Sequence, residues 1–134
     1  MIEFFMPMVP PSITHQTQAI TVVKGKPRVY DTPELKDARA KLTAHLAGHA
    51  PKQRLTGPVR LMTTWIWPAK GDRCPGDWKT TKPDTDNVVK LLKDCMTRLG
   101  YWKDDSQVCS ECTEKIWGQR PGIFVRVEQL GKGM

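Results

Sequence analysis

The sequence predicts a single α+β domain in which two helices pack on a mixed β-sheet. The chain has 134 residues, a length that suits one modest hydrophobic core. Hydrophobic residues make up 39% and charged residues 26%, a globular composition. Two segments carry apolar residues at helical spacing, and several others are rich in strand formers, in mixed order along the chain. We therefore treat residues 1–134 as one domain.

The first part of the chain predicts strands separated by a loop. The apolar run at residues 2–6 predicts the first strand, and the Pro-rich polar stretch at 7–18 predicts a loop. Residues 19–31 predict a hairpin, because two β-branched runs flank a Lys-Gly-Lys turn.

Two segments predict helices. Thr32 is placed as an N-cap before Pro33 at the first helical position, and residues 34–50 follow with helical periodicity. The second helix is expected over residues 86–99, and Gly100 follows it in the position that ends many helices. The expected buried positions are Leu35, Ala38, Leu42 and Leu46 in the first helix, and Val88, Leu91, Leu92, Cys95, Met96 and Leu99 in the second.

The remaining segments predict three strands and one long loop. Residues 58–67 alternate in polarity and predict a strand, as do residues 106–118 and 122–130. The intervening segment, residues 70–83, is rich in Gly, Pro and basic residues, so we expect a mobile basic loop that leads into the second helix.

The lack of a targeting or membrane-spanning signal predicts a cytoplasmic protein. No apolar run is long enough for a bilayer, and the start lacks a basic leader, so no membrane partner is expected. The four cysteines are then expected as free thiols. Cys109 and Cys112 have the spacing of half a zinc site, but a second Cys-x-x-Cys pair is missing.

The positive charge is concentrated in the first part of the chain. Residues 1–83 hold 13 Lys/Arg and 6 Asp/Glu, which accounts for the net charge of +7, whereas residues 84–134 hold 8 of each. A basic surface favours a polyanion such as nucleic acid, although many soluble proteins share this balance. His15 and Trp78 lie in polar loops, where either could contact a base or a sugar; the alternative for Trp78 is that it caps the core. The candidate phosphate contacts are Lys24, Lys26, Arg28, Lys70, Arg73, Lys79 and Lys82.

Asp84 and Asp86 flank the start of the second predicted helix, and their carboxylates have two explanations. Each could cap the helix by accepting free backbone N–H groups at the positive end of the dipole. Alternatively, both could hold a hard divalent cation such as Mg²⁺, which prefers oxygen ligands. Lys90 lies one turn after Asp86, either as an ion-pair partner or as a cation over such a site.

Asp105 lies within reach of the same helix end. The helix is about 20 Å long at roughly 1.5 Å per residue, and the chain from Leu99 to Asp105 spans at most about 20 Å. We expect this segment to return antiparallel and bring Asp105 to Asp84 and Asp86, with residues 101 and 102 packed on the core. Contact across a dimer is the alternative. Asp104 and Asp105 are expected in an extended run, pointing to opposite sides.

This pattern resembles the RusA family of phage-derived Holliday junction resolvases. The resemblance is carried by Asp-x-Asp-Asn-x-x-Lys at 84–90, by Asp94 and Gly100, and by Asp-Asp-Ser-Gln-Val at 104–108. The Pro-rich loop and the closing strands are also similar, more loosely.

The resemblance implies a homodimeric endonuclease that cuts four-way DNA junctions in recombination and repair. It implies Mg²⁺, with Mn²⁺ as a substitute ion, and no small-molecule cofactor. It assigns Asp84, Asp86 and Asp105 as metal ligands and gives Lys90 an essential basic role. Two alternatives remain open: a DNA-binding protein without catalysis, or a nuclease of forks and flaps.

Overall fold

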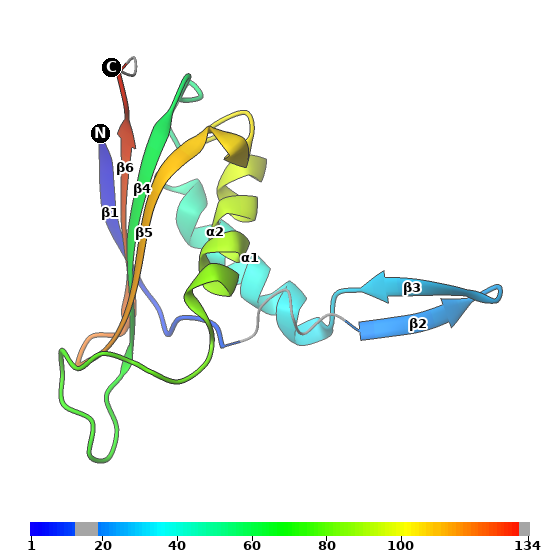
Figure 1. Cartoon of the computed structure of the whole chain (residues 1–134), viewed down its shortest axis with the longest axis horizontal. Coiled ribbons are helices and arrows are strands. Elements are labelled where there is room, and N and C mark those ends of the chain that lie inside the picture. The colour runs from blue at the N-terminus through cyan, green and yellow to red at the C-terminus, as the bar shows by residue number, and fades with distance from the viewer. Residues whose placement is uncertain (13–18, 132–134) are drawn as a thin grey trace.

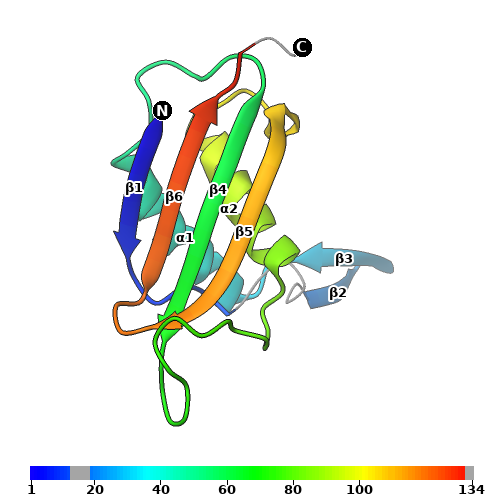
Figure 2. The same ribbon diagram turned by 60° about the vertical axis from the view of Figure 1, so that its left-hand side comes forward.

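The computed structural model describes residues 1–12 and 19–131, and its main body is a four-stranded sheet covered on one face by two helices (Figures 1 and 2). This confirms the predicted α+β class. In chain order the elements are β1 (Ile2–Pro7), β2 (Ala19–Val23), β3 (Lys26–Tyr30), α1 (Pro33–Ala47), β4 (Val59–Pro68), α2 (Thr85–Arg98), the 3₁₀ turn η2 (Asp105–Gln107), β5 (Val108–Gly118) and β6 (Gly122–Gln129).

The sheet is mixed, with strand order β1-β6-β4-β5. β6 pairs antiparallel with both β1 and β4, whereas β4 and β5 are parallel. A parallel pair needs a long crossover connection, and α2 supplies it here. Alternate residues of β4 are buried against the helices, from Val59 through Trp67. One face of the sheet is therefore buried, and the opposite face is partly exposed.

Helix α1 forms as its sequence predicts. Thr32 is the N-cap and its Oγ1 accepts a hydrogen bond from the Leu35 N–H at 3.3 Å, while Pro33 occupies the first turn. The four expected buried residues are all buried.

Helix α2 buries a slightly different face from the one predicted. Val89 joins the core, whereas Leu99 is the C-cap and only partly buried. Gly100 follows with φ +84°, a left-handed conformation that favours glycine at this position. Tyr101 and Trp102 are fully buried, as expected, and the Tyr101 hydroxyl donates to the Leu46 carbonyl at 2.6 Å.

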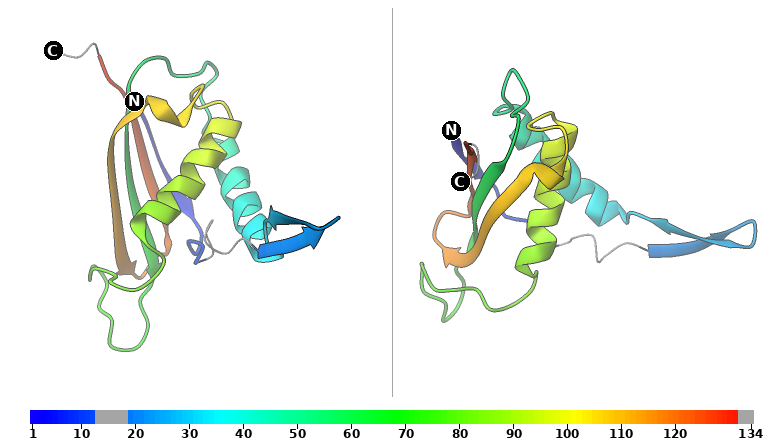
Figure 3. Two further views of the ribbon diagram at one scale, coloured as in Figure 1. Left: turned by 45° about the vertical axis from the view of Figure 1, so that its right-hand side comes forward. Right: turned by 45° about the horizontal axis from the view of Figure 1, so that its top comes forward.

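The β2–β3 hairpin forms a separate two-stranded sheet that projects away from the main body (Figures 1 and 3). Its turn consists of Lys24 and Gly25, both with positive φ, so that Lys26 already belongs to β3 rather than to the expected three-residue turn. Two positive φ values suit the twist of a tight hairpin. Lys24 and Lys26 are exposed at the tip.

No helix among the described residues is long and apolar enough to cross a membrane.

Candidate active site

Asp84 and Asp86 lie exposed at the N-terminal end of α2, and the structure bears on the capping explanation for Asp84. Asp84 is the N-cap residue, with extended backbone (φ −75°, ψ 151°), but its carboxylate makes no capping hydrogen bond. Its backbone carbonyl accepts from the Val88 N–H at 3.2 Å. Helix capping therefore does not account for the Asp84 carboxylate, which stands at the positive end of the helix dipole with its oxygens available to a ligand.

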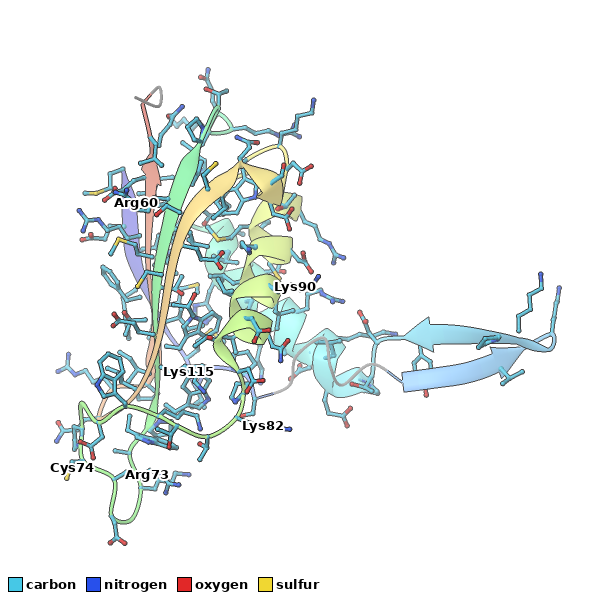
Figure 4. All side chains as sticks on the ribbon, viewed as in Figure 1. Arg60, Arg73, Cys74, Lys82, Lys90 and Lys115 are labelled. Atoms are coloured by element: carbon cyan, nitrogen blue, oxygen red, sulfur yellow. The ribbon has the colours of Figure 1, made fainter. Side chains whose placement is uncertain are left out.

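Lys115 anchors the backbone that leads into Asp84. Its Nζ donates to the carbonyls of Thr81 at 2.7 Å and Pro83 at 2.6 Å, and Figure 4 shows Lys115 of β5 close to the segment before α2. The sequence alone does not identify this residue, because a lysine in a strand carries no local sign that it will reach two carbonyls more than 30 positions earlier. Lys115 thus links β5 to the position of Asp84.

A small cavity of about 240 Å³ lies beside Asp86, between α2 and β5. Glu111 and Thr113 of β5 line it together with Asp86. Thr113 Oγ1 is buried and has no hydrogen-bond partner among the described residues, and Glu111 pairs with Lys93 at 2.8 Å. Every polar side chain of this cavity offers oxygen, the donor that Mg²⁺ prefers. The donor set at this end of α2 therefore fits a hard divalent cation.

Asp104 and Asp105 do not lie in an extended run, and that expectation is wrong. Asp104 caps the turn η2: its carboxylate accepts from the Ser106 N–H at 3.1 Å, and Gln107 Oε1 accepts from the Asp104 N–H at 3.2 Å. An acidic N-cap followed three residues later by Gln is a capping-box pattern, which the sequence already contained.

The two neighbouring carboxyl groups perturb each other. The pKa of Asp105 is raised, first by its hydrogen bond to the Asp104 side chain, then by burial and by the Asp104 charge. The pKa of Asp104 is lowered, chiefly because its carboxylate accepts the Ser106 N–H. Asp105 thus keeps its proton to a higher pH than an ordinary aspartate.

Asp105 also lies further along α2 than expected. The charges on that helix that act on its carboxyl group are those of Lys93 and Asp94, two turns beyond Asp86. The predicted antiparallel return does not occur, because the chain turns through η2 and enters β5 at the C-terminal end of α2 (Figure 2). Among the described residues, acidic side chains do not gather in a group of three that could hold one metal ion. Asp84 and Asp86 share a helix end, and Asp105 lies apart from them.

Most of the predicted basic contacts are exposed, on two segments that flank the N-terminal end of α2 (Figure 3). Lys24 and Lys26 lie at the hairpin tip, whereas Lys70, Arg73 and Lys82 lie on the 70–83 segment. Lys90 is exposed on α2, one turn after Asp86 (Figure 4). His15 lies outside the described residues. The backbone of Arg28 pairs with Thr21 in the hairpin, and its side chain is not among those described.

Lys79 is the exception, and its expected exposure is wrong. The residue is only 8% exposed, with Nζ 4.3 Å from the Trp117 ring centre and 5.3 Å from that of Trp67. Burial lowers its pKa, and the charges of Lys115 and Arg73 lower it further. The ammonium lies among aromatic rings, which attract cations through their negative faces. Lys79 therefore anchors its segment to the sheet.

The second half of the 70–83 segment pairs with β5, contrary to the expectation of a mobile loop throughout. The Gly76 N–H donates to the Trp117 carbonyl at 2.7 Å, and the Lys79 N–H donates to the Lys115 carbonyl at 3.0 Å. Between them, Trp78 forms an antiparallel bridge with Ile116. The segment is thus held to the outer edge of β5 by one isolated bridge and flanking hydrogen bonds, which a Gly/Pro-rich sequence does not predict.

Cys109 and Cys112 are free and exposed on β5. Cys109 lies at an irregularity in the pairing of β5 with β4, where the register shifts between Val59 and Arg60. Among the described residues, the two cysteines do not belong to a group of three or more metal-ligating side chains.

Comparisons with known proteins agree with this architecture. The family model described as endodeoxyribonuclease RusA matches residues 7–128. The chain is 32% identical over 119 residues to the crossover junction endodeoxyribonuclease rusA of Lactococcus phage r1t, covering 87% of this chain and 89% of that protein. It is 28% identical over 121 residues to the uncharacterized protein YqaN of Bacillus subtilis (strain 168), covering 82% and 84% of the two chains. The chain belongs to the RusA family of endodeoxyribonucleases.

Proposed function

We propose that this enzyme resolves four-way DNA junctions by metal-dependent hydrolysis of phosphodiester bonds, in DNA recombination and repair. The observation that carries the proposal is the N-terminal end of α2, where the Asp84 carboxylate makes no capping hydrogen bond and Asp86 lines an oxygen-rich cavity. The family membership and the similarity to a phage crossover junction endodeoxyribonuclease support the same substrate.

Asp84 and Asp86 would hold the divalent cation, Mg²⁺ or Mn²⁺. The metal would supply Lewis-acid polarisation of the phosphate and a more acidic bound water. The chain itself contributes the position of the two carboxylates: Lys115 fixes the carbonyls before Asp84, and the first turn of α2 presents Asp86. Lys90, exposed one turn further on, would add positive charge near the reacting phosphate.

Asp105 is the third acidic residue in this proposal. It borders the same helix at Lys93 and Asp94, next to the Lys93–Glu111 ion pair. We infer that Asp105 reaches the metal of the other subunit across a dimer, because within its own chain it lies near Lys93 and Asp94 and apart from Asp84 and Asp86. Metal titration of Asp105→Asn tests its contribution separately from that of Asp86.

The two basic segments would hold DNA on either side of the cleavage site. Lys24 and Lys26 at the hairpin tip and Lys70, Arg73 and Lys82 on the other segment are exposed and suited to phosphate contacts. A homodimer would match the two-fold symmetry of a four-way junction, because two equivalent strands must be cut.

The decisive experiment compares Asp86→Asn with Asp37→Asn, an exposed aspartate on α1 paired with Lys41. Asp86→Asn keeps the shape but removes a charged ligand, so junction binding should persist while cleavage falls roughly 100-fold or more, at 1.36 kcal/mol per tenfold. Asp37→Asn should cleave as the wild type does. Cleavage by Asp86→Asn at the wild-type rate would refute the assigned site.

A substrate panel separates the alternatives. The wild type is assayed on a four-way junction, a fork, a flap and a duplex, with Mg²⁺, Mn²⁺ or EDTA. Preferential, metal-dependent cutting of the junction is expected. Preferential cutting of forks or flaps would identify the enzyme as a fork or flap nuclease. Binding without cleavage would identify a non-catalytic DNA-binding protein.

A further inference from the structure

The side chain of Trp78 is unusually placed for a tryptophan of this chain. It is 66% exposed, whereas Trp65, Trp67 and Trp102 are at most 5% exposed and Trp117 is partly buried. A single exposed aromatic residue needs no explanation by itself. Trp78, however, borders a cavity, and its backbone is hydrogen-bonded to β5. These two features together are typical of a ligand-binding aromatic residue.

The backbone of Trp78 is held on both sides. Trp78 forms a bridge with Ile116, the following residue donates to β5 at 3.0 Å, and the Trp117 N–H donates to the preceding Asp77 carbonyl at 2.9 Å. The ring is therefore presented from a loop segment that is hydrogen-bonded to β5, and little backbone entropy would be lost when a ligand stacks on it.

The adjoining cavity has a volume of about 540 Å³. Trp78 and Trp117 contribute aromatic surface, and Arg73, Asp77, Thr80 and Thr81 contribute hydrogen-bonding groups. The Arg73 guanidinium lies 4.4 Å from the centre of the Trp117 ring, and Lys79 lies 4.3 Å from it, so Trp78 carries the ring that is open to stacking.

The charge of this lining bears on what it can bind. Asp72 and Asp77 balance the positive charges of Arg73 and of Lys79, whose Nζ lies 4.3 Å from the Trp117 ring, so charge does not single out a phosphate as the ligand. A neutral, flat, hydrogen-bonding group suits it better, and a nucleobase has this chemistry: its face stacks on aromatic rings and its edge pairs with polar side chains.

The cavity also lies near the proposed cleavage site. Asp84 follows Trp78 by six positions, so the two lie within about 20 Å even in an extended chain. Lys115 connects them structurally, because it neighbours Ile116 in β5 and its Nζ bonds the Pro83 carbonyl at 2.6 Å. At 3.4 Å per nucleotide along one strand, this span covers about six nucleotides.

We propose that this cavity is a nucleobase-binding subsite, in which Trp78 stacks on one unpaired base of the cleaved strand within about six nucleotides of the scissile phosphate. The inference rests on the proposed function for its substrate. A branch point interrupts base stacking, so a base is turned out there at lower cost than within a duplex. The subsite would thereby favour branched over continuous DNA.

The test combines protein variants with abasic substrates, and affinity is measured without metal. Trp78→Ala should bind a four-way junction about 5- to 100-fold more weakly than the wild type, the range for loss of one base–aromatic stack. Trp78→Phe should retain most of the affinity. Duplex binding should be unchanged in both variants. Val9→Ala, which truncates another exposed apolar side chain, 59% exposed, serves as the control.

In a series of junctions, each junction then carries a single abasic nucleotide at a different position around the cut. At one of these positions, the missing base should weaken binding by the wild type but cause no further loss of binding by Trp78→Ala. Trp78 is the most exposed tryptophan, so acrylamide quenching of tryptophan fluorescence should fall on junction binding and not on duplex binding.

Two results would overturn the subsite: an unchanged junction-to-duplex affinity ratio in Trp78→Ala, or additive effects of Trp78→Ala and every abasic position. Failure of the wild type to cleave any branched DNA would instead refute the proposed function, because the affinity measurements need no metal and no cleavage.

Discussion

Replacement of Lys115 by Met tests whether one lysine of β5 positions the start of α2. Methionine keeps most of the aliphatic packing of the side chain but removes the hydrogen bonds to the Thr81 and Pro83 carbonyls, at 2.7 and 2.6 Å. A hydrogen bond to a charged group contributes about 1.5–3 kcal/mol when desolvated, and Lys115 is only partly buried. Loss of Lys115 also relieves the repulsion that lowers the pKa of Lys79. We expect a net loss of about 2 kcal/mol of unfolding free energy.

Urea and thermal denaturation measure this loss. For a domain of this size, about 2 kcal/mol corresponds to roughly 6–10 °C in Tm. The matched control is Lys41→Met, in which an ion pair of 3.2 Å between side chains 66% and 67% exposed is removed. Such exposed pairs contribute a few tenths of a kcal/mol. If both variants lose the same stability, within about 0.5 kcal/mol, Lys115 does not hold the segment.

Two further predictions concern the packing around Gly122 and the neighbouring carboxyl groups of Asp104 and Asp105. Gly122→Ala should destabilise the fold by about 1–3 kcal/mol in urea denaturation, because its Cβ would lie 2.1 Å from Phe5 Cζ, whereas Gly131→Ala meets nothing within 4 Å and should be neutral. Asp104→Asn should lower the pKa of Asp105, as measured by NMR titration, because it removes the Asp104 carboxylate whose hydrogen bond and charge raise this pKa. An unchanged titration midpoint would contradict the mutual perturbation of these two residues.

Local patterns in the sequence were sufficient for the two helices and the main strands, and they identified the acidic residues at the start of α2. Thr32, Pro33 and four apolar positions at helical spacing predicted α1, because a cap and an amphipathic stripe are encoded within one short segment. The start of α2, with Asp84 and Asp86, was equally local. The α+β class followed from the order of such segments.

The tertiary structure decided which side chains meet across the chain. Lys79 reads as a surface lysine in a polar loop, yet it is buried against Trp67 and Trp117 because its segment pairs with the open edge of β5. Asp105 reads as a residue that can reach Asp84, yet the turn at η2 places it beside Lys93. Chain length sets only an upper limit on distance, and the path within that limit depends on hydrogen bonds to distant strands.

The parallel pairing of β4 with β5 is the common cause of these differences. Each strand is recognisable by itself, but alternation of polar and apolar residues does not specify its neighbour or its direction. Once β5 lies beside β4, its residues Glu111, Thr113 and Lys115 face α2 and the segment before it. The sequence by itself therefore determined the elements and the acidic residues at the start of α2, whereas the surroundings of those residues depended on strand pairing, an interaction between segments far apart in the chain.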